Sequence, residues 1–250
     1  MKSLEKVIKL IDVMKNQGHG IRISDLSEIL DMPNSSVHRM LAVLHKHGYV
    51  NKDAETKKYK LGLQFLEVSK NILESLDLRT VANPYLIRLM NDTNETVHLS
   101  ILERNMIFFI DRVECHQTIR SQPKIGMRVA PHLSSSGKVF LAYLQPNKQK
   151  RILSEIEFSA WLPNSIKDIG VLQKELEAIK AQHFAIDDEE GELGQRCVAA
   201  PVFDHTGSIT AAVSISGPTT RLTNENLVNH YSAFVIATAN EISIALGYRE

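Results

Sequence analysis

A proline at position 33 divides one stretch of apolar, helix-like periodicity into two short segments. Residues 24–30 and 34–46 each place apolar side chains at intervals of three and four residues, which predicts two amphipathic helices. Because proline cannot continue the first helix and only residues 31–33 lie between the segments, the two helices must meet at a tight turn. The two helices and their turn form a helix–turn–helix motif, which constrains how the first part of the chain can fold.

The segments on either side of this pair complete a small domain. Residues 4–14 predict a further amphipathic helix, and residues 49–52 and 57–61 predict two short strands joined by a polar tip. Three short helices followed by a two-stranded hairpin make a winged helix–turn–helix, whose third helix normally enters the major groove of DNA. Ser24 is expected to cap the second helix, and Asn34 or Ser35 the third.

The outward side of the third helix decides what this domain can bind. If Val37 and Leu41 point inward, a rotation of about 100° per residue places Arg39 outward. Arginine can contact guanine through two hydrogen bonds, and serine hydroxyls at a helix start can donate to phosphates. The predicted DNA-binding residues are Arg22, Asn34, Ser35, Ser36, His38, Arg39, Lys46, Lys57 and Lys58. The alternative is a small helical bundle with an ordinary solvated face.

The charge of the chain is balanced overall but not along its length. Lys plus Arg and Asp plus Glu both number 29, whereas residues 1–70 carry 12 basic against 8 acidic side chains. A basic excess at the end that holds the helix–turn–helix favours a polyanionic partner over the bundle alternative.

The rest of the chain predicts a second, larger domain. Its expected elements are a connecting helix over 64–80, a helix starting at Asn83-Pro84, strands over 97–102 and 106–113, helices over 136–144, 149–155 and 166–182 with Ser165 as the cap of the last, strands over 196–203 and 208–216, and a final helix capped by Thr223. The fold class is therefore α+β. We expect a DNA-binding domain over 1–63, a connecting helix over 64–81 and a second domain over 82–250.

Five segments of the chain are similar to signatures of a known family. Within residues 3–63 they are Leu26–Leu41 and the short stretches His47–Val50 and Lys58–Gly62, and in the second half of the chain they are His132–Lys138 and Asp187–Val202. They resemble the isocitrate lyase regulator (IclR) family along nearly the whole chain. The resemblance implies a one-component transcription factor that dimerises through its DNA-binding half. It also implies a GAF-like α/β effector-binding domain, with helices packed on a curved antiparallel sheet.

A run of small residues at 131–138 leads into a helix, and the amide groups and dipole at a helix start favour an anion such as a carboxylate. By the resemblance, the amides of Ser135 and Ser136 match positions that hold an organic acid in the family. Asp187 and Cys197 match further positions of that pocket. The sequence thus predicts an effector site in the second domain.

Arg128 and His132 are further candidates, as partners for a second carboxylate or hydroxyl group of the effector, although surface contacts explain them equally well. The other candidates also have simpler explanations. Ser135 or Ser136 could cap the helix, Cys197 could be a small buried residue of a strand, and Asp187 could belong to a solvated acidic surface over 187–190.

Catalysis, metal binding and membrane insertion are supported by no motif. The sequence contains no GxSxG, HExxH, Walker loop or GxGxxG after a strand, and His98, His116 and His205 lie on separate segments without metal-ligand spacing. The 2 cysteines lie far apart, and neither a signal peptide nor a long apolar run is present. We expect a cytoplasmic protein with no catalytic residue, cofactor or metal.

The predicted function is a ligand-responsive regulator of a catabolic operon, and repression and activation both fit the sequence. Its expected partners are a double-stranded DNA operator, a small organic or sugar acid, and further copies of itself, as a homodimer or a dimer of dimers. The alternative is an architectural DNA-binding protein whose second domain only oligomerises and senses no ligand.

Overall fold

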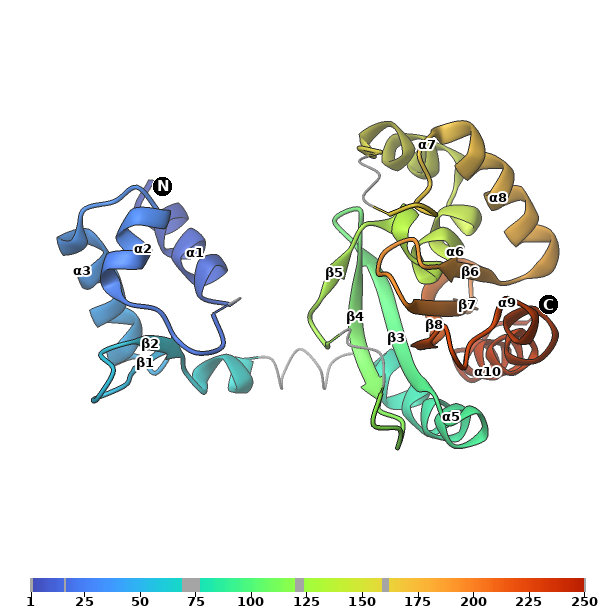
Figure 1. The fold of residues 1–250 in the computed structure, drawn as a ribbon, viewed down its shortest axis with the longest axis horizontal. Coiled ribbons are helices and arrows are strands. Elements are labelled where there is room, and N and C mark those ends of the chain that lie inside the picture. Colours follow the sequence, from blue (N-terminus) through green and yellow to red (C-terminus); the bar gives the residue numbers. More distant parts are fainter. Residues whose placement is uncertain (1, 16, 69–76, 120–123, 159–161, 250) are drawn as a thin grey trace. The chain divides into compact units, whose positions relative to one another are not determined.

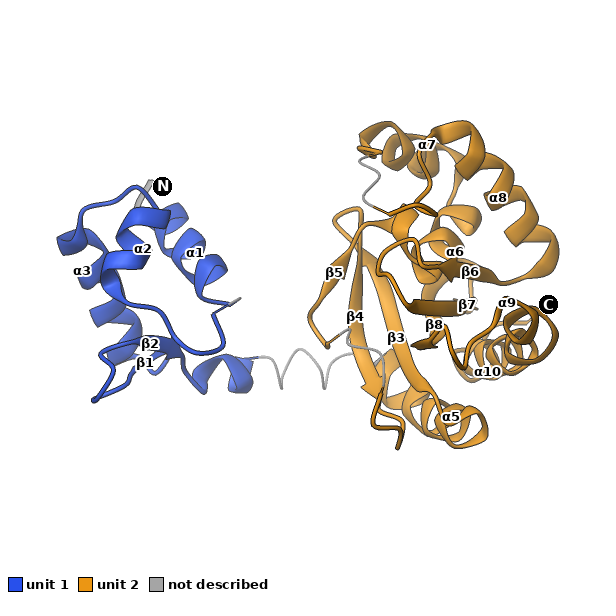
Figure 2. Ribbon diagram, in the orientation of Figure 1, with its two compact units in different colours: residues 1–76 blue, residues 77–250 orange. Residues whose placement is uncertain are grey.

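The computed structural model describes residues 2–15, 17–68, 77–119, 124–158 and 162–249, which belong to two compact units (Figure 1 and Figure 2). Unit 1 comprises residues 1–76 and unit 2 comprises residues 77–250. The expected connecting helix is described only in part, because residues 64–68 are helical and residues 69–76 lie outside the described residues. Each unit has its own hydrophobic core and is considered by itself.

Unit 1 has the elements of a winged helix–turn–helix, as the sequence predicts. Its elements are α1 (Lys2–Met14), α2 (Ile23–Ile29), α3 (Asn34–Lys46), β1 (Val50–Lys52) and β2 (Tyr59–Leu61). Leu10, Leu26 and Leu41, one from each helix, are completely buried in one core together with Val50 of β1. The two strands pair antiparallel, and a bridge between Ile21 and Tyr59 attaches the segment before α2 to the hairpin.

The predicted caps of α2 and α3 are wrong. Arg22 and Pro33 occupy the N-cap positions, and neither side chain makes a capping hydrogen bond. Ser24 lies inside α2, and Asn34 and Ser35 are the first residues of α3. Pro33 is compatible with the N-cap position for two reasons. Its fixed φ is allowed just before a helix, and its carbonyl still accepts hydrogen bonds from the amides of Ser36 and Val37.

Unit 2 is one antiparallel sheet with helices on both faces. Its elements are α5 (Asp77–Thr93), β3 (Thr96–Glu103), β4 (Met106–Val113), β5 (Arg128–Val129), the 3₁₀-helix η1 (Pro131–Leu133), α6 (Ser135–Tyr143), α7 (Pro146–Glu155), α8 (Ile169–Gln182), β6 (Ala185–Asp188), β7 (Gln195–Phe203), β8 (Ile209–Pro218), α9 (Asn224–Asn226), the π-helical turn η2 (Leu227–Tyr231) and α10 (Ser232–Ala245). Six described strands lie in the order β5-β4-β3-β8-β7-β6.

The two faces of this sheet carry different layers (Figure 1). α5 and α10 cover one face, where Leu86 and Ile242 pack with Leu99 and Val213. α6 and α8 cover the other face, where apolar residues such as Val139 pack against alanines of β7 and β8. Because side chains alternate between the two faces of a strand, every second residue of β3, β7 and β8 points toward α6.

The expected helix start at Asn83-Pro84 is wrong, because α5 continues through Pro84. Proline leaves the carbonyl four residues earlier without its helical partner. Ala82, Leu86 and Leu89 are nevertheless almost completely buried on the sheet, and this packing offsets the lost hydrogen bond.

The structure adds two strands that the sequence analysis did not identify, β5 and β6, at the two edges of the sheet. It also corrects one cap, because the side chain of Asp168, and not of Ser165, accepts a hydrogen bond from the amide of Val171 at the start of α8. The predicted cap of the last helical segment is confirmed, since the hydroxyl of Thr223 accepts from the amide of Asn226 at 3.2 Å.

Candidate functional site

The outer face of α3 presents polar side chains to solvent. Val37 and Leu41 are completely buried, and this fixes the rotation of the helix. Arg39 and Lys46 are exposed on the opposite side, as are Ser35 and His38, whereas Ser36 is half-buried. A helix of 13 residues with a buried stripe and an exposed cationic face has the form that enters a major groove.

The hairpin brings further cations beside this helix. Asp53 organises the hairpin tip, because its Oδ1 accepts hydrogen bonds from the amides of Glu55 and Thr56 and from the hydroxyl of Thr56. The hydrogen bonds from Thr56 lower the pKa of Asp53, so this carboxylate stays ionised. Lys57, with a φ of 58°, is exposed, and Lys58 is half-buried.

Arg22 and Asn34, the remaining predicted DNA-binding residues, are both exposed. Arg22 follows Ile21, whose amide and carbonyl both hydrogen bond to Tyr59 in the hairpin, at 3.0 and 2.8 Å. Asn34 lies at the first position of α3, at the positive end of the helix dipole. The nine predicted residues therefore lie on α3, at the start of α2 and on the hairpin, and all of them retain access to solvent.

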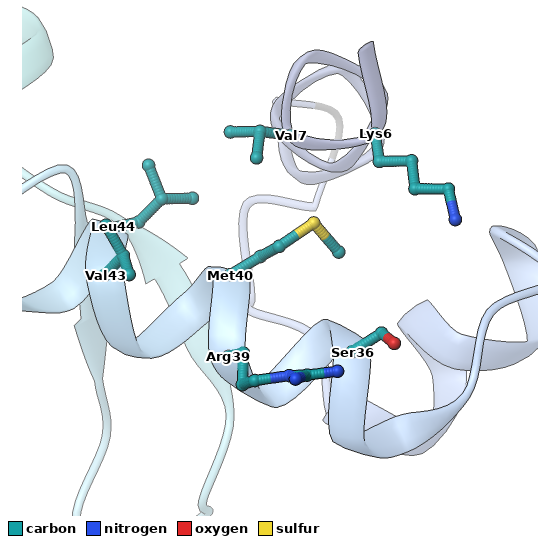
Figure 3. Close-up of a pocket in the computed structure, with 7 residues that line it drawn as sticks. All are labelled: Lys6, Val7, Ser36, Arg39, Met40, Val43 and Leu44. Carbon is teal, nitrogen blue, oxygen red and sulfur yellow. The ribbon is translucent and has the colours of Figure 1, made fainter. Parts of the chain in front are cut away.

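A groove runs between α1 and α3 beside Arg39 (Figure 3). Lys6, Val7, Ser36, Arg39, Met40, Val43 and Leu44 line it. The side chain of Arg39 extends along α3 toward Ser36, and Met40 reaches across toward α1. Val43 is 60% exposed, so an apolar strip of α3 lies uncovered next to the predicted base-contacting arginine.

In unit 2 the start of α6 is buried and its first residues are free of a capping role. Ser134, and not Ser135 or Ser136, is the N-cap, because its hydroxyl accepts from the amide of Gly137 at 3.1 Å. Ser135 and Ser136 are each only 2% exposed. Gly137 permits this arrangement, since a Cβ at that position would collide with the backbone of Pro131.

The sheet supplies the facing wall. Asp187, Cys197 and Ser216 occupy paired positions on β6, β7 and β8, so their side chains point to the same face. Ser214 lies two residues before Ser216 and therefore shares that face. All four are buried polar or thiol side chains on the side of the sheet that faces α6.

The start of α6 and this wall enclose one small cavity of about 90 Å³. Its lining residues are Phe109, Met127, Val129, Leu133, Ser134, Ser135, Ser136, Asp187, Gly191, Glu192, Gln195, Cys197, Ser214 and Ser216. Among the described residues that line the cavity, two side chains are acidic and none is basic. An anion in this cavity would therefore be held by backbone amides and neutral donors.

Asp187 and Cys197 are both perturbed by burial. Burial raises the pKa of Asp187 to about 6, although the amide of Glu190, which donates to its Oδ1 at 2.9 Å, acts in the opposite direction. Burial also raises the pKa of the Cys197 thiol, so the thiol is neutral at pH 7. At pH 7 the wall therefore carries the negative charge of Asp187 and none from Cys197.

A buried ion cluster lies behind Asp187. The Nζ of Lys138, on α6, donates to Glu175 at 2.5 Å and to Glu190 at 2.6 Å, and the lysine side chain is 0% exposed. Burial lowers the pKa of Lys138, but the two carboxylates outweigh this effect and raise it, so the lysine is charged. Burial raises the pKa of Glu190 to about 7.

Two predicted effector residues do not line the cavity. Arg128, on β5, has its guanidinium paired with Glu103 at 2.5 Å and placed 5.0 Å from the ring centre of Phe108. His132 is buried in η1, with its ring 5.4 Å from that of Phe158, and burial lowers its pKa. Of the six predicted effector residues, the structure therefore brings Ser135, Ser136, Asp187 and Cys197 together at the cavity and leaves Arg128 and His132 outside its lining.

The sequence analysis predicted Asp187 and Cys197 of the sheet wall but missed Ser214 and Ser216. A signal was present, because two serines at alternate positions of a strand that is otherwise apolar must share one face. Within the described ranges no group of three or more His, Cys, Asp or Glu residues is placed to hold a metal ion. Over the same residues, no helix combines the length and the apolar character needed to cross a membrane.

Two family models match the chain. The model described as the IclR helix-turn-helix domain matches residues 3–54, and the model described as the bacterial transcriptional regulator IclR C-terminal region matches residues 70–244. The HTH-type transcriptional regulator BhcR of Paracoccus denitrificans is 33% identical over 250 residues, which cover 100% of this chain and 89% of that protein.

Solved structures agree with this match. The IclR of Thermotoga maritima has a TM-score of 0.82 and 34% identity, covering 99% of this chain and 100% of that one. An IclR homologue of Microbacterium hydrocarbonoxydans complexed with 4-hydroxybenzoate shares the fold, with a TM-score of 0.85, 22% identity and 98% coverage of each chain.

Proposed function

Because this chain belongs to the IclR family of bacterial transcriptional regulators, we propose that it controls a catabolic operon in response to a small organic or sugar acid. Unit 1 binds the operator in this proposal, and the cavity of unit 2 binds the effector. A protein with this task works in the cytoplasm, where the operator lies, and needs no catalytic residue.

The observation that carries the effector proposal is the cavity itself. It joins the buried start of α6 to four polar or thiol side chains of the sheet, although α6 and β6 to β8 are distant in sequence. Ser135 and Ser136 do not cap the helix, so their amides and hydroxyls are available to a carboxylate. The small volume suits a compact acid. The 4-hydroxybenzoate held by a structural relative is an acid of this class.

The DNA-binding proposal rests on the exposed face of α3 and on the hairpin. In this proposal Arg39, which is exposed on α3, reads a base edge, whereas Lys57 and Lys58 of the hairpin contact phosphates. Two copies of the chain would set two such helices in successive major grooves of a palindromic operator, about 34 Å apart. Exposed apolar side chains on α1 and α3, Leu4, Ile8 and Val43, support association of two copies through unit 1.

The effector acts on the operator only through differential affinity. A ligand that binds one arrangement of the dimer more tightly than another shifts the population between them, and this changes the spacing of the two recognition helices. A dimer of dimers would follow the same rule on a longer operator.

A thermal-shift screen of the full chain against small organic and sugar acids tests the proposal. Acids that bind only the folded state must raise Tm. We expect a subset of acids to stabilise the wild type and to leave Ser136→Trp unaffected, because the indole fills the cavity. His205→Trp, in an exposed turn of the same unit, is the matched control and should respond like the wild type. No response in the wild type, with operator binding intact, would instead favour a purely architectural protein.

A further inference from the structure

His98 is a buried polar side chain of unit 2 that does not line the cavity. It lies in the middle of β3 and is 0% exposed. In the described part of the chain, neither of its ring nitrogens has a hydrogen-bond partner. Burying two unpaired polar atoms destabilises a fold, so an imidazole kept at this position needs a reason other than packing.

The position of His98 in the sheet connects it to the effector cavity. Its neighbours Val97 and Leu99 belong to the core under α5 and α10, so His98 points to the opposite face, toward α6. Ser214, which lines the cavity, is its direct partner on β8. His98 therefore lies on the same wall as the cavity residues, one strand further along the sheet.

Phe109 lies at the boundary between the cavity and His98. Its ring lines the cavity, and its centre lies 5.2 Å from that of the His98 ring, in an edge-to-face arrangement. The register of β3 with β4 shifts between Leu99 and Ser100, so that Phe109 pairs with Ser100 and shares the face of His98. Phe109 therefore both lines the cavity and contacts the imidazole.

The imidazole is neutral. Burial, together with the positive charge of Arg112 on β4, lowers the pKa of His98 to about 3. A neutral imidazole offers one N–H donor and one acceptor nitrogen. A hydroxyl group can satisfy either nitrogen, and it can be buried without a net charge.

We propose that His98 is a specificity-determining residue for the effector. The effector is a hydroxy acid whose carboxylate lies at the start of α6 and whose hydroxyl group displaces the ring of Phe109 and hydrogen bonds to His98. This inference rests on the proposed function, since it assigns the far end of a ligand held in the same cavity. It narrows the ligand class from acids in general to acids with a hydroxyl group away from the carboxylate.

Matched pairs of acids test this assignment on the full chain. The probes are glycerate, gluconate and 4-hydroxybenzoate, each compared by calorimetry with the acid that lacks the hydroxyl groups, namely propanoate, hexanoate and benzoate. In the wild type we expect at least one hydroxy acid to bind about tenfold more tightly than its partner, as one buried hydrogen bond allows. In His98→Leu that ratio should fall to about one, while the affinity for the partner acid stays the same.

Control variants separate this role from a structural one. Ser100→Ala, two residues along the same strand and also buried, should keep the wild-type ratio. His98→Gln, which keeps a hydrogen-bond donor and an acceptor, should keep part of the wild-type preference for the hydroxy acid. His98→Leu should be at least as stable as the wild type without ligand, because it removes two unpaired polar atoms.

Three results would overturn the role of His98 in effector specificity, and a fourth would overturn the small-acid effector as well. An undiminished preference for the hydroxy acid in His98→Leu overturns the inference, and so does a loss of stability in the ligand-free His98→Leu protein. Loss of the preference in Ser100→Ala as well as in His98→Leu also overturns it. If the wild type binds none of the six acids, the small-acid effector fails, and the role of His98 fails with it.

Discussion

The backbone N–H of Glu190 donates a hydrogen bond of 2.9 Å to Oδ1 of Asp187, and this bond joins the cavity wall to a buried ion cluster. Glu190 in turn accepts from Lys138, which lies on α6 three residues after Ser135. Asp187 on the sheet and the start of α6 face each other across the cavity. Hydrogen bonds through Glu190 and Lys138 therefore connect these two sides. A ligand that alters the charge of Asp187 acts on the same cluster that anchors α6.

Asp187→Asn should change the pH dependence of stability. The pKa of Asp187 is raised from 3.8 to about 6 in the folded protein, so the folded state holds a proton that the unfolded chain releases. This carboxyl group therefore stabilises the fold below pH 4, and its contribution is lost as the pH rises to about 6. We expect Asp187→Asn to gain stability relative to the wild type over this range, by at most about 3 kcal/mol. Urea unfolding at pH 4, 5, 6 and 7.5 measures the difference, and a difference that is constant with pH would contradict the assignment.

Lys138→Met should strongly destabilise unit 2. The substitution keeps the buried chain but leaves the carboxylates of Glu175 and Glu190 without their common cation. Removing one partner of a buried ion pair typically costs about 3–5 kcal/mol. Lys174→Met, on the exposed side of α8, is the control and should change the free energy of unfolding by less than about 0.5 kcal/mol. If the two substitutions change the free energy of unfolding equally, the ion cluster contributes little to the stability of unit 2.

Arg39→Ala and Lys58→Ala should affect DNA binding in different ways. Loss of a base-contacting arginine is expected to weaken operator binding by about 1–3 kcal/mol and to relax the preference at one base pair. Loss of a phosphate-contacting lysine should weaken binding to all sequences similarly and reduce the salt dependence. Fluorescence anisotropy with a selected operator and a scrambled duplex distinguishes the two. If Arg39→Ala discriminates between the operator and the scrambled duplex as well as the wild type does, Arg39 of α3 does not recognise a base.

Gly137→Ala should destabilise the start of α6, although alanine normally favours a helix over glycine. The added Cβ would collide with the backbone of Pro131 and push η1 away from α6. We expect a loss of about 1–3 kcal/mol in the free energy of unfolding, and a weaker response to the effector. Gly18→Ala, where no atom lies within 4 Å of the added Cβ, is the control. A neutral Gly137→Ala would show that the Pro131 backbone can move freely.

The fold of unit 1 could be predicted from its sequence because local signals agree there. Apolar periodicity, the break at Pro33 and the short hairpin strands all indicate the same arrangement. The predicted N-caps of α2 and α3 were wrong because side-chain propensity does not show at which residue the backbone enters the helix. Pro84 misled the prediction of α5 because tertiary packing outweighed the missing hydrogen bond.

The cavity could be predicted only in part. The start of α6 was predicted from its small residues, but β5 and β6 are edge strands of 2 and 4 residues and carry no periodic pattern. β6 ends in two aspartates, a residue type depleted in strands. His98 carried no sequence signal of its proposed role. That role rests on its ring nitrogens having no hydrogen-bond partner among the described residues, and on the pairing of β3 with β4 and β8.

The operator affinity of the full chain, measured with and without a stabilising acid, shows whether the cavity of unit 2 controls DNA binding. Fluorescence anisotropy on the same operator should show that the acid changes the Kd of the wild type, and that Ser136→Trp binds the operator with the wild-type Kd but no longer responds to the acid. An undiminished response in Ser136→Trp would contradict the account, because the effector would then act at a site other than the cavity between α6 and the sheet.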